Sequence, residues 1–262
     1  MKRLQDISLY LFALLTLAAF NGAALVGLIC TRQLGRRFGL YGLIDNDTVG
    51  WIFSAILVIY AIALGLIAVA TWRNASAAAN VASQEASQIP VLYRGLLGYP
   101  QPLQNEIKGV LVRYLKSIIE DAWPAQRRGE VTEEGIKDLL ELGHRIITFE
   151  PATVGQCVVY GEVMRSFNTL TAFRRRRIEA ASYAVPKSLW CVVLSGAALS
   201  IFASYVFNIP SLLVHSLMTV LLASMIALLV FFIAATDNPY QGANSIEPTA
   251  YRIALHDVLE FQ

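Results

Sequence analysis

The stretch of sequence that decides the fold runs from Ser188 to Thr236 and reads SLWCVVLSGAALSIFASYVFNIPSLLVHSLMTVLLASMIALLVFFIAAT. It contains no Asp, Glu, Lys or Arg over 49 residues. A helix that crosses a bilayer needs roughly 20 apolar residues, so this stretch is too long for one span. Asn208-Ile209-Pro210 interrupts it near the middle, where proline breaks a helix. We therefore expect a hairpin of two membrane-spanning helices.

Two more uncharged windows lie upstream, from Ile7 to Thr31 and from Thr48 to Trp72, with 25 residues each. Over the whole chain 56% of the residues are hydrophobic and the mean hydropathy is +0.53. Only 15% are charged, against about 25% in a typical soluble domain. The sequence predicts an all-α integral membrane protein with four spans in two pairs and a helical cytoplasmic domain between the pairs.

The expected organisation divides the chain into four parts. These are a first transmembrane pair (1–72), a cytoplasmic helical domain (73–187), a second transmembrane pair (188–236) and a cytoplasmic C-terminal tail (237–262).

The part between the pairs has the pattern of helices throughout. The second span continues past Arg73, with no Gly or Pro before Pro90. Apolar residues then recur at three- and four-residue spacing from Leu103 to Ile119, and Pro124 is expected to end that helix. Further helices are expected from about Thr132 and from about Ala152.

The distribution of basic residues predicts the orientation. Four spans place both termini and the central domain on one side. That side holds Lys2, Arg3, Arg252 and 15 basic residues from Arg73 to Lys187. The other side holds three arginines, at 32, 36 and 37. The positive-inside rule therefore puts the termini and the central domain in the cytoplasm, most simply at a bacterial inner membrane.

Motifs for catalysis and cofactor binding are absent from the sequence. It has no GxGxxG, GxxxxGK, GxSxG or HExxH. Cys30, Cys157 and Cys191 have no CxxC or histidine partner at ligand spacing, so we expect buried thiols that fill apolar space. The net charge of +2 gives no indication of nucleic-acid binding. We expect no enzyme, no catalytic residue, no cofactor and no metal.

Two polar residues lie within the spans. His215 follows Pro210 closely, and we favour an interfacial or packing role over a place in an ion path. Asn21 is midway through the first span, where a hydrogen bond to a neighbouring helix is favoured over substrate binding.

The lack of charge within the spans favours a passive pore over an ion-coupled transporter, which usually needs ionisable groups at membrane depth. Four helices are too few to enclose a pore, so several copies would be required. One face of the second span carries small residues that could line it or could pack against another helix, namely Ser54, Ala61, Gly65 and Ala68. A basic run could attract anions to a vestibule or form an exposed helix end, namely Arg174, Arg175, Arg176 and Arg177.

Several segments carry a resemblance to a known family. They are Trp72-Arg73-Asn74-Ala75, a stretch around Glu85, Tyr114 followed by Glu120-Asp121-Ala122-Trp123-Pro124, Val185-Pro186-Lys187-Ser188-Leu189-Trp190, and Asp237-Asn238-Pro239-Tyr240-Gln241-Gly242. From residue 49 to residue 255 the chain resembles the bestrophin-like membrane proteins of bacteria and plants, a domain of unknown function that is remotely similar to bestrophin anion channels.

The resemblance implies a homo-oligomeric, pentameric anion channel whose second span lines the pore, with the bilayer, other copies of the chain and small anions as partners. In bestrophins a calcium clasp of acidic residues follows the Pro-aromatic-Gly element. Here Gly242 is followed by Ala243, Asn244 and Ser245, with only Glu247 nearby. A calcium site needs about six oxygen ligands, so we expect no metal.

Two alternatives to a channel remain open. One is a non-conducting membrane scaffold or sensor whose cytoplasmic helices bind a protein partner. The other is a membrane-embedded enzyme acting on lipid, for which the segment Asp237–Glu247 is the sole candidate site. A turn set by Pro239 and Gly242 explains that segment more simply.

Overall fold

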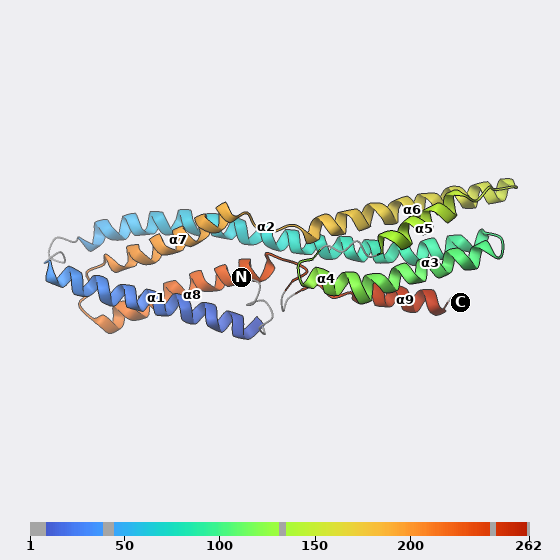
Figure 1. The fold of residues 1–262 in the computed structure, drawn as a ribbon. Coiled ribbons are helices and arrows are strands. Elements are labelled where there is room, and N and C mark those ends of the chain that lie inside the picture. Colours follow the sequence, from blue (N-terminus) through green and yellow to red (C-terminus); the bar gives the residue numbers. More distant parts are fainter. Residues whose placement is uncertain (1–8, 39–44, 131–134, 242–244, 261–262) are drawn as a thin grey trace. The chain divides into compact units, whose positions relative to one another are not determined.

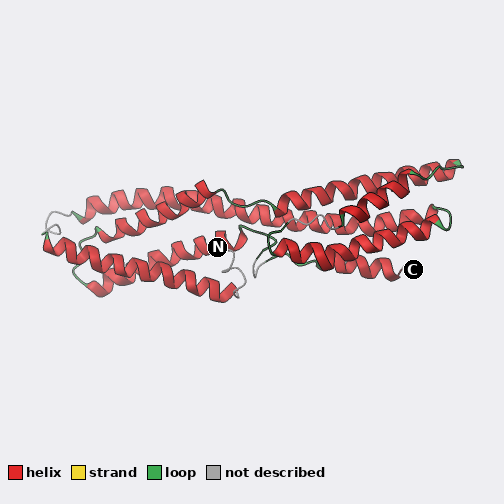
Figure 2. Ribbon diagram, viewed as in Figure 1, coloured by secondary structure: helices red, strands yellow, loops and turns green. Residues whose placement is uncertain are grey.

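The computed structural model describes residues 9–38, 45–130, 135–241 and 245–260. Within these ranges every regular element is a helix (Figure 2). The α-helices, labelled in Figure 1, are α1 (Leu9–Arg37), α2 (Asn46–Gly95), α3 (Leu103–Ser117), α4 (Trp123–Arg127), α5 (Ile136–Ile147), α6 (Val154–Ala181), α7 (Lys187–Tyr205), α8 (Leu212–Thr236) and α9 (Thr249–Glu260).

Four of these helices, α1, α2, α7 and α8, are long and apolar enough to cross a membrane. The predicted fold class is therefore confirmed: the protein is all-helical, with four spans and a helical segment between the two pairs. The chain divides into two compact units. We call residues 1–73 and 184–237 the membrane unit, and residues 74–183 and 238–262 the second unit.

The core of the membrane unit is made of small and branched side chains that allow the helices to pack closely. Its buried members are Ala24, Leu28, Leu64, Ala68, Val193, Ala197, Ile201, Tyr205, Ala223, Ile226, Val230 and Ile233. Gly196 on α7 packs against the ring of Tyr60 on α2, where a Cβ atom would overlap a ring carbon. The Tyr60 hydroxyl donates a hydrogen bond to the Val193 carbonyl at 2.9 Å, so this contact joins α2 to α7.

Neutral hydrogen bonds link the spans. Asn21 Nδ2 on α1 lies 2.9 Å from Ser224 Oγ on α8, so the predicted interhelical role of Asn21 is confirmed. Thr236 Oγ1 on α8 lies 3.1 Å from Thr71 Oγ1 on α2. Such bonds pair polar groups that would otherwise face hydrocarbon.

The second unit is built on the later part of α2, which is continuous from Asn46 to Gly95 as expected and includes Pro90. The expectation that Pro124 ends the preceding helix is wrong. A π-helical turn, Ile118–Ala122, leads into α4, and Pro124 occupies the first turn of that helix. Proline is tolerated there because the first backbone N–H groups of a helix have no intrahelical partner.

Two further helices of the second unit, α5 and α6, begin within a few residues of the predicted positions. Gly135, with a φ of 78°, precedes α5, and the expected start at Thr132 lies outside the described residues. Thr153 and Gln156 form a capping box at the start of α6, in which each side chain bonds the backbone N–H of the other residue.

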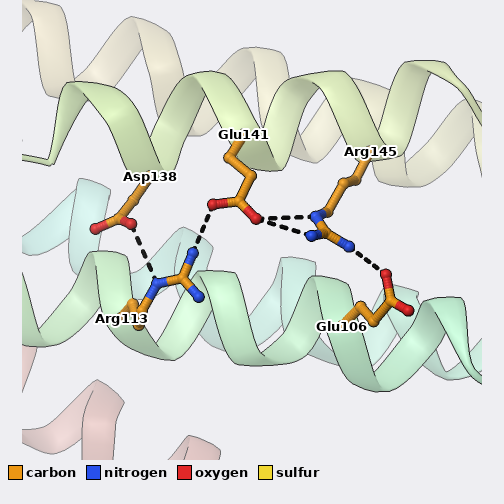
Figure 3. Close-up of polar contacts among 5 residues, drawn as sticks. All are labelled: Glu106, Arg113, Asp138, Glu141 and Arg145. Carbon is orange, nitrogen blue, oxygen red and sulfur yellow. Dashed lines mark hydrogen bonds and ion pairs between the residues drawn. The ribbon is translucent and has the colours of Figure 1, made fainter.

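A layer of ion pairs joins α3 to α5 on the surface of the second unit (Figure 3). Arg113 lies 3.3 Å from Asp138 and 2.6 Å from Glu141. Arg145 pairs with Glu141 within its own helix and with Glu106 on α3. Glu141 therefore bridges two arginines, and these exposed pairs align the two helices.

The expectation of buried thiols is wrong, because Cys30, Cys157 and Cys191 are all exposed in the single chain. Their positions on outward helix faces, which one sequence does not mark as outward, account for the difference.

Candidate functional site

The four proposed pore residues of α2 differ in their exposure to solvent. Ser54 and Ala61 are exposed, and Gly65 is half-buried. Ala68 is buried in the core of the membrane unit beside Leu64, so it presents no surface to a pore. The Ser54 hydroxyl donates to the Gly50 carbonyl of its own helix at 2.8 Å.

A larger apolar row lies on the outward side of α2. Val58, Ile62 and Leu66 follow one another at four-residue spacing, which places them on one helix face. Ile62 is 60% exposed, and its two neighbours in the row are similarly open. Sequence reasoning passed over this row because an outward apolar face of a span has the same composition as its core.

The four adjacent arginines of α6 also differ in their exposure to solvent. Arg175 and Arg176 are exposed and Arg174 is half-buried, whereas Arg177 is only 2% exposed. Arg175 pairs with Glu179 at 2.9 Å. Arg177 is therefore unavailable to a water-filled vestibule, because it is enclosed in the core of the second unit.

Arg177 pairs with Glu85, a family-motif residue that is 0% exposed. Arg177 Nε lies 2.6 Å from Glu85 Oε2, and Nη2 lies 3.4 Å from Oε1. The Tyr114 hydroxyl donates to Glu85 Oε1 at 2.9 Å. The carboxylate thus accepts from α6 and α3 while it projects from α2. Burial of both charges is tolerated because each is paired and hydrogen-bonded.

Aromatic rings surround this ion pair. The Arg177 guanidinium carbon lies 5.8 Å from the centre of the Trp123 ring and 5.9 Å from that of Tyr251. Trp123 also contacts Tyr240 and Tyr251, with ring centres 5.4 and 5.3 Å apart. Its indole N–H donates to the Ile246 carbonyl at 3.0 Å. Cation–π attraction therefore adds to the ion pair.

The pKa values of the tyrosines reflect this setting. Burial, and then the negative charge of Glu85, raises the pKa of Tyr114 well above 10, and the same causes act on Tyr251. Burial raises the pKa of Tyr240 to about 12. For Arg177 burial lowers the pKa, but the charge and hydrogen bond of Glu85 together with the nearby Tyr251 and Tyr114 outweigh it, and the net shift is upward. The tyrosines stay neutral and the arginine charged at physiological pH.

The remaining motif residues shape the turns next to α8. Within the membrane unit the Asp237 carboxylate accepts the Val185 backbone N–H at 2.5 Å and the Trp190 indole N–H at 3.3 Å. Within the second unit the Pro239 carbonyl accepts the Ile246 N–H at 2.9 Å.

Of the other motif residues, the Tyr240 hydroxyl lies 3.3 Å from the Ala78 carbonyl, Pro124 is exposed, and Gly242 lies outside the described residues.

The described part of this segment does not fit a calcium clasp. Both oxygens of Asp237 already accept N–H groups, and Glu247 is the only other carboxylate nearby. Among the residues that the structure describes, no group of three His, Cys, Asp or Glu side chains is placed to hold a metal ion. The Glu85–Arg177 ion pair and the aromatic side chains around it are buried in the core of the second unit, where they form a packing centre.

Sequence reasoning missed one member of this centre, Tyr251, and the pairing of Arg177 with Glu85. Tyr251 lies on α9, a helix within what was expected to be a tail. The spacing of Tyr251, Ala254 and Val258 is helical and could have revealed it. The partnership of Arg177 with Glu85 has no signal in one sequence, because the two residues are 92 positions apart on different helices.

Residues 13–251 match the protein family described as "Bestrophin-like domain". No curated protein matches the chain. Among solved structures, a bacterial bestrophin homologue from Klebsiella pneumoniae is similar with a TM-score of 0.71 and 18% identity, covering 94% of this chain and 97% of that one.

Two further structures agree with this likeness. A variant of the Klebsiella pneumoniae homologue with an Ile-to-Thr mutation has a TM-score of 0.68 at 16% identity, with 94% and 99% of the two chains covered. A structure described as a membrane protein with a Pro-to-Ala substitution has a TM-score of 0.71 at 17% identity, with 97% and 98% covered. At these identities the likeness shows a shared fold.

Proposed function

Because the chain belongs to the bestrophin-like family, which is a family of membrane proteins and not of enzymes, we propose that it is a passive anion channel built from several copies. In this proposal α2 of each copy lines a central pore. The number of copies follows from the resemblance and is five.

The observation that carries the proposal is the uncharged, outward-facing sector of α2. No charged residue occurs from Thr48 to Trp72, and the row Val58, Ile62 and Leu66 points away from the core of the membrane unit. Ser54, Ala61 and Gly65 flank that row. Narrow apolar walls conduct ions when wetted and close by dewetting, so a ring of such rows makes a gate.

Selectivity for anions would come from the basic side chains of α6. Arg174, Arg175 and Arg176 remain at least partly exposed, and Arg175 forms an ion pair with Glu179. Grouped positive charge raises the local concentration of anions at a pore mouth. The positive-inside rule puts this mouth, both termini and the second unit in the cytoplasm of a bacterial cell, with the spans in the inner membrane.

Chloride efflux from liposomes tests the proposal. Purified chain reconstituted at known density should release chloride faster than protein-free liposomes, and native mass spectrometry of the same sample should give a pentamer. Arg175→Gln with Arg176→Gln should lower the preference for chloride over potassium, whereas Arg165→Gln with Arg128→Gln, which removes the same charge elsewhere, should not. A monomer, or efflux no faster than background, contradicts the channel.

A second candidate function is a non-conducting scaffold. The second unit exposes large apolar side chains on α5 and α6, namely Leu140, Ile147, Val154 and Val158. Exposed apolar side chains of this kind favour a docking role when they are contiguous. A stable oligomer that leaves these four accessible to solvent labelling and shows no chloride efflux would favour the scaffold over the channel.

A further inference from the structure

A cavity of about 180 Å³ lies within the membrane unit, between α2 and the outer part of the α7–α8 hairpin. Most of its lining is apolar: Phe53, Phe207, Ile209, Met218 and Leu222. Phe53 and Phe207 meet edge to face, with ring centres 5.2 Å apart. The other three lining residues are polar, namely Ser204, His215 and Thr219. The cavity thus combines an apolar wall with a small polar patch.

Thr219 is the unusual member of this patch. It is 1% exposed, and its hydroxyl forms no hydrogen bond within the part of the chain that the structure describes. A threonine in a helix ordinarily bonds the carbonyl one turn back, as Thr236 does to Phe232 at 2.8 Å. A buried hydroxyl without a partner is unfavourable, so the position suits a bound group that can hydrogen-bond.

His215 supplies the second polar group. One ring nitrogen, Nε2, lies 2.9 Å from the Ser204 carbonyl oxygen. A carbonyl can only accept, so Nε2 carries the hydrogen, and in the neutral ring Nδ1 is left as an acceptor. The patch therefore offers a hydroxyl that can donate or accept and an imidazole nitrogen that can accept.

The chemistry of the lining selects the class of ligand. None of its residues is Lys, Arg, Asp or Glu, so an ion entering it would lose hydration without compensation. An apolar cavity of about 150 Å³ is large enough for benzene, so this one accommodates a single ring or a short chain. Met218 is mostly exposed on the outward face of α8, and its flexible side chain allows entry from the bilayer.

We propose that this cavity binds a small neutral amphiphile, an alcohol or phenol, whose hydroxyl bonds Thr219 and His215 while its apolar body packs against the apolar wall that includes Phe53 and Phe207. The site is separate from the proposed pore row, which lies on the outward face of α2. Occupancy would brace α2 against the α7–α8 hairpin.

Photolabelling tests the site in the full-length protein in lipid nanodiscs. The probe is a phenol that carries a trifluoromethyl-diazirine, and the matched probe lacks only the hydroxyl. Labelled residues are mapped by mass spectrometry. We expect the phenol probe to label Phe53 and Met218 saturably, with unlabelled phenol as a competitor, and the matched probe to label them more weakly. The readout does not depend on whether the protein conducts ions.

Three variants make the test specific. Thr219→Val keeps the shape of the side chain and should weaken phenol labelling about fivefold, the effect of one neutral hydrogen bond. Thr219→Ser should preserve it. Ser200→Ala removes another buried hydroxyl without a partner in the described chain, outside the cavity, and should leave labelling unchanged.

Other outcomes overturn the proposal. Labelling that does not saturate, that is equal for the two probes, or that Thr219→Val leaves intact would mean that the cavity holds only water or lipid chains. Met218→Trp places a bulky side chain in the cavity lining, so undiminished labelling of Phe53 in that variant would also exclude the site.

Discussion

In the second unit Glu85 and Arg177 form a buried ion pair, whereas in the membrane unit Asn21 and Ser224 are joined by a neutral hydrogen bond. Both contacts join helices that are distant in sequence. The second unit can bury charge because Tyr114 and the surrounding rings complete the site. Within a bilayer an ionised pair costs far more, so neutral groups take its place.

Arg32 is an exception to the use of neutral groups in the membrane unit. It is buried near the end of α1, and its guanidinium donates to the Pro210 carbonyl at 2.5 Å. The backbone carbonyl before Ser211 serves as the partner that a carboxylate provides in the second unit. The comparison teaches that a buried charge can take different partners: a carboxylate pairs with Arg177 in the second unit, and a backbone carbonyl bonds Arg32 in the membrane unit.

The largest loss of stability is expected from removing one charge of the Glu85–Arg177 ion pair. Arg177→Met leaves Glu85 buried and unpaired and should cost about 3–5 kcal/mol of unfolding free energy. Arg176→Met, at the exposed neighbouring position, should cost less than about 0.5 kcal/mol. Chemical denaturation in detergent measures both.

A second variant separates the ion pair from packing alone. In the double variant Glu85→Gln with Arg177→Met, the unpaired charge is gone and an acceptor remains for Tyr114, so most of the loss should be recovered. A double variant no more stable than Arg177→Met would show that the pairing of charges is not what stabilises this centre.

The tyrosines of the second unit should make its stability fall at high pH. The folded pKa of Tyr114 is raised above the usual value of 10, so its contribution is complete below pH 10 and is lost as the pH rises toward the folded pKa. Tyr240, with a pKa of about 12, acts in the same direction between pH 10 and 12.

Tyr114→Phe should lower stability by about 1 kcal/mol at neutral pH and flatten the fall above pH 10. Unfolding followed by circular dichroism at pH 8, 10 and 11 checks both effects. Identical pH profiles for the variant and the wild type would contradict the role of the hydroxyl.

The neutral contact in the membrane unit should contribute less. Asn21→Ala removes the hydrogen bond to Ser224, and interhelical bonds of this kind in membranes contribute about 0.6 kcal/mol. Ser224→Ala should have a similar effect, and the two together should cost little more than either alone. Additive losses would show that the two side chains act independently.

The smallest effect is expected at the surface ion pairs of Figure 3. Glu141→Gln removes the carboxylate that bridges Arg113 and Arg145, yet exposed pairs contribute only about 0–1 kcal/mol. The loss should shrink further in high salt, because ions screen exposed charges. A loss as large as that of Arg177→Met would undo the contrast between buried and exposed pairs.

The spans and most helices could be predicted because hydrophobic runs and helical spacing are local properties. The hairpin at Pro210 and the helix that continues past Arg73 are examples. The burial of Arg177 and Ala68 could not be predicted, because neither a run of four arginines nor a stripe of small residues shows which side of the helix meets another helix. The outward row on α2 was missed for the same reason, since core and lipid-facing positions of a span are both apolar.

Single-channel recording of Ile62→Thr in planar bilayers tests the central claim most directly. Threonine on a pore wall favours wetting, so the variant should open more often or carry a larger chloride current than the wild type. Leu14→Thr makes a matched change at an exposed apolar position of α1, 62% exposed against 60% for Ile62, and should leave the current unchanged. If Ile62→Thr and Leu14→Thr behave alike, or neither they nor the wild type conducts, α2 does not line an anion pore.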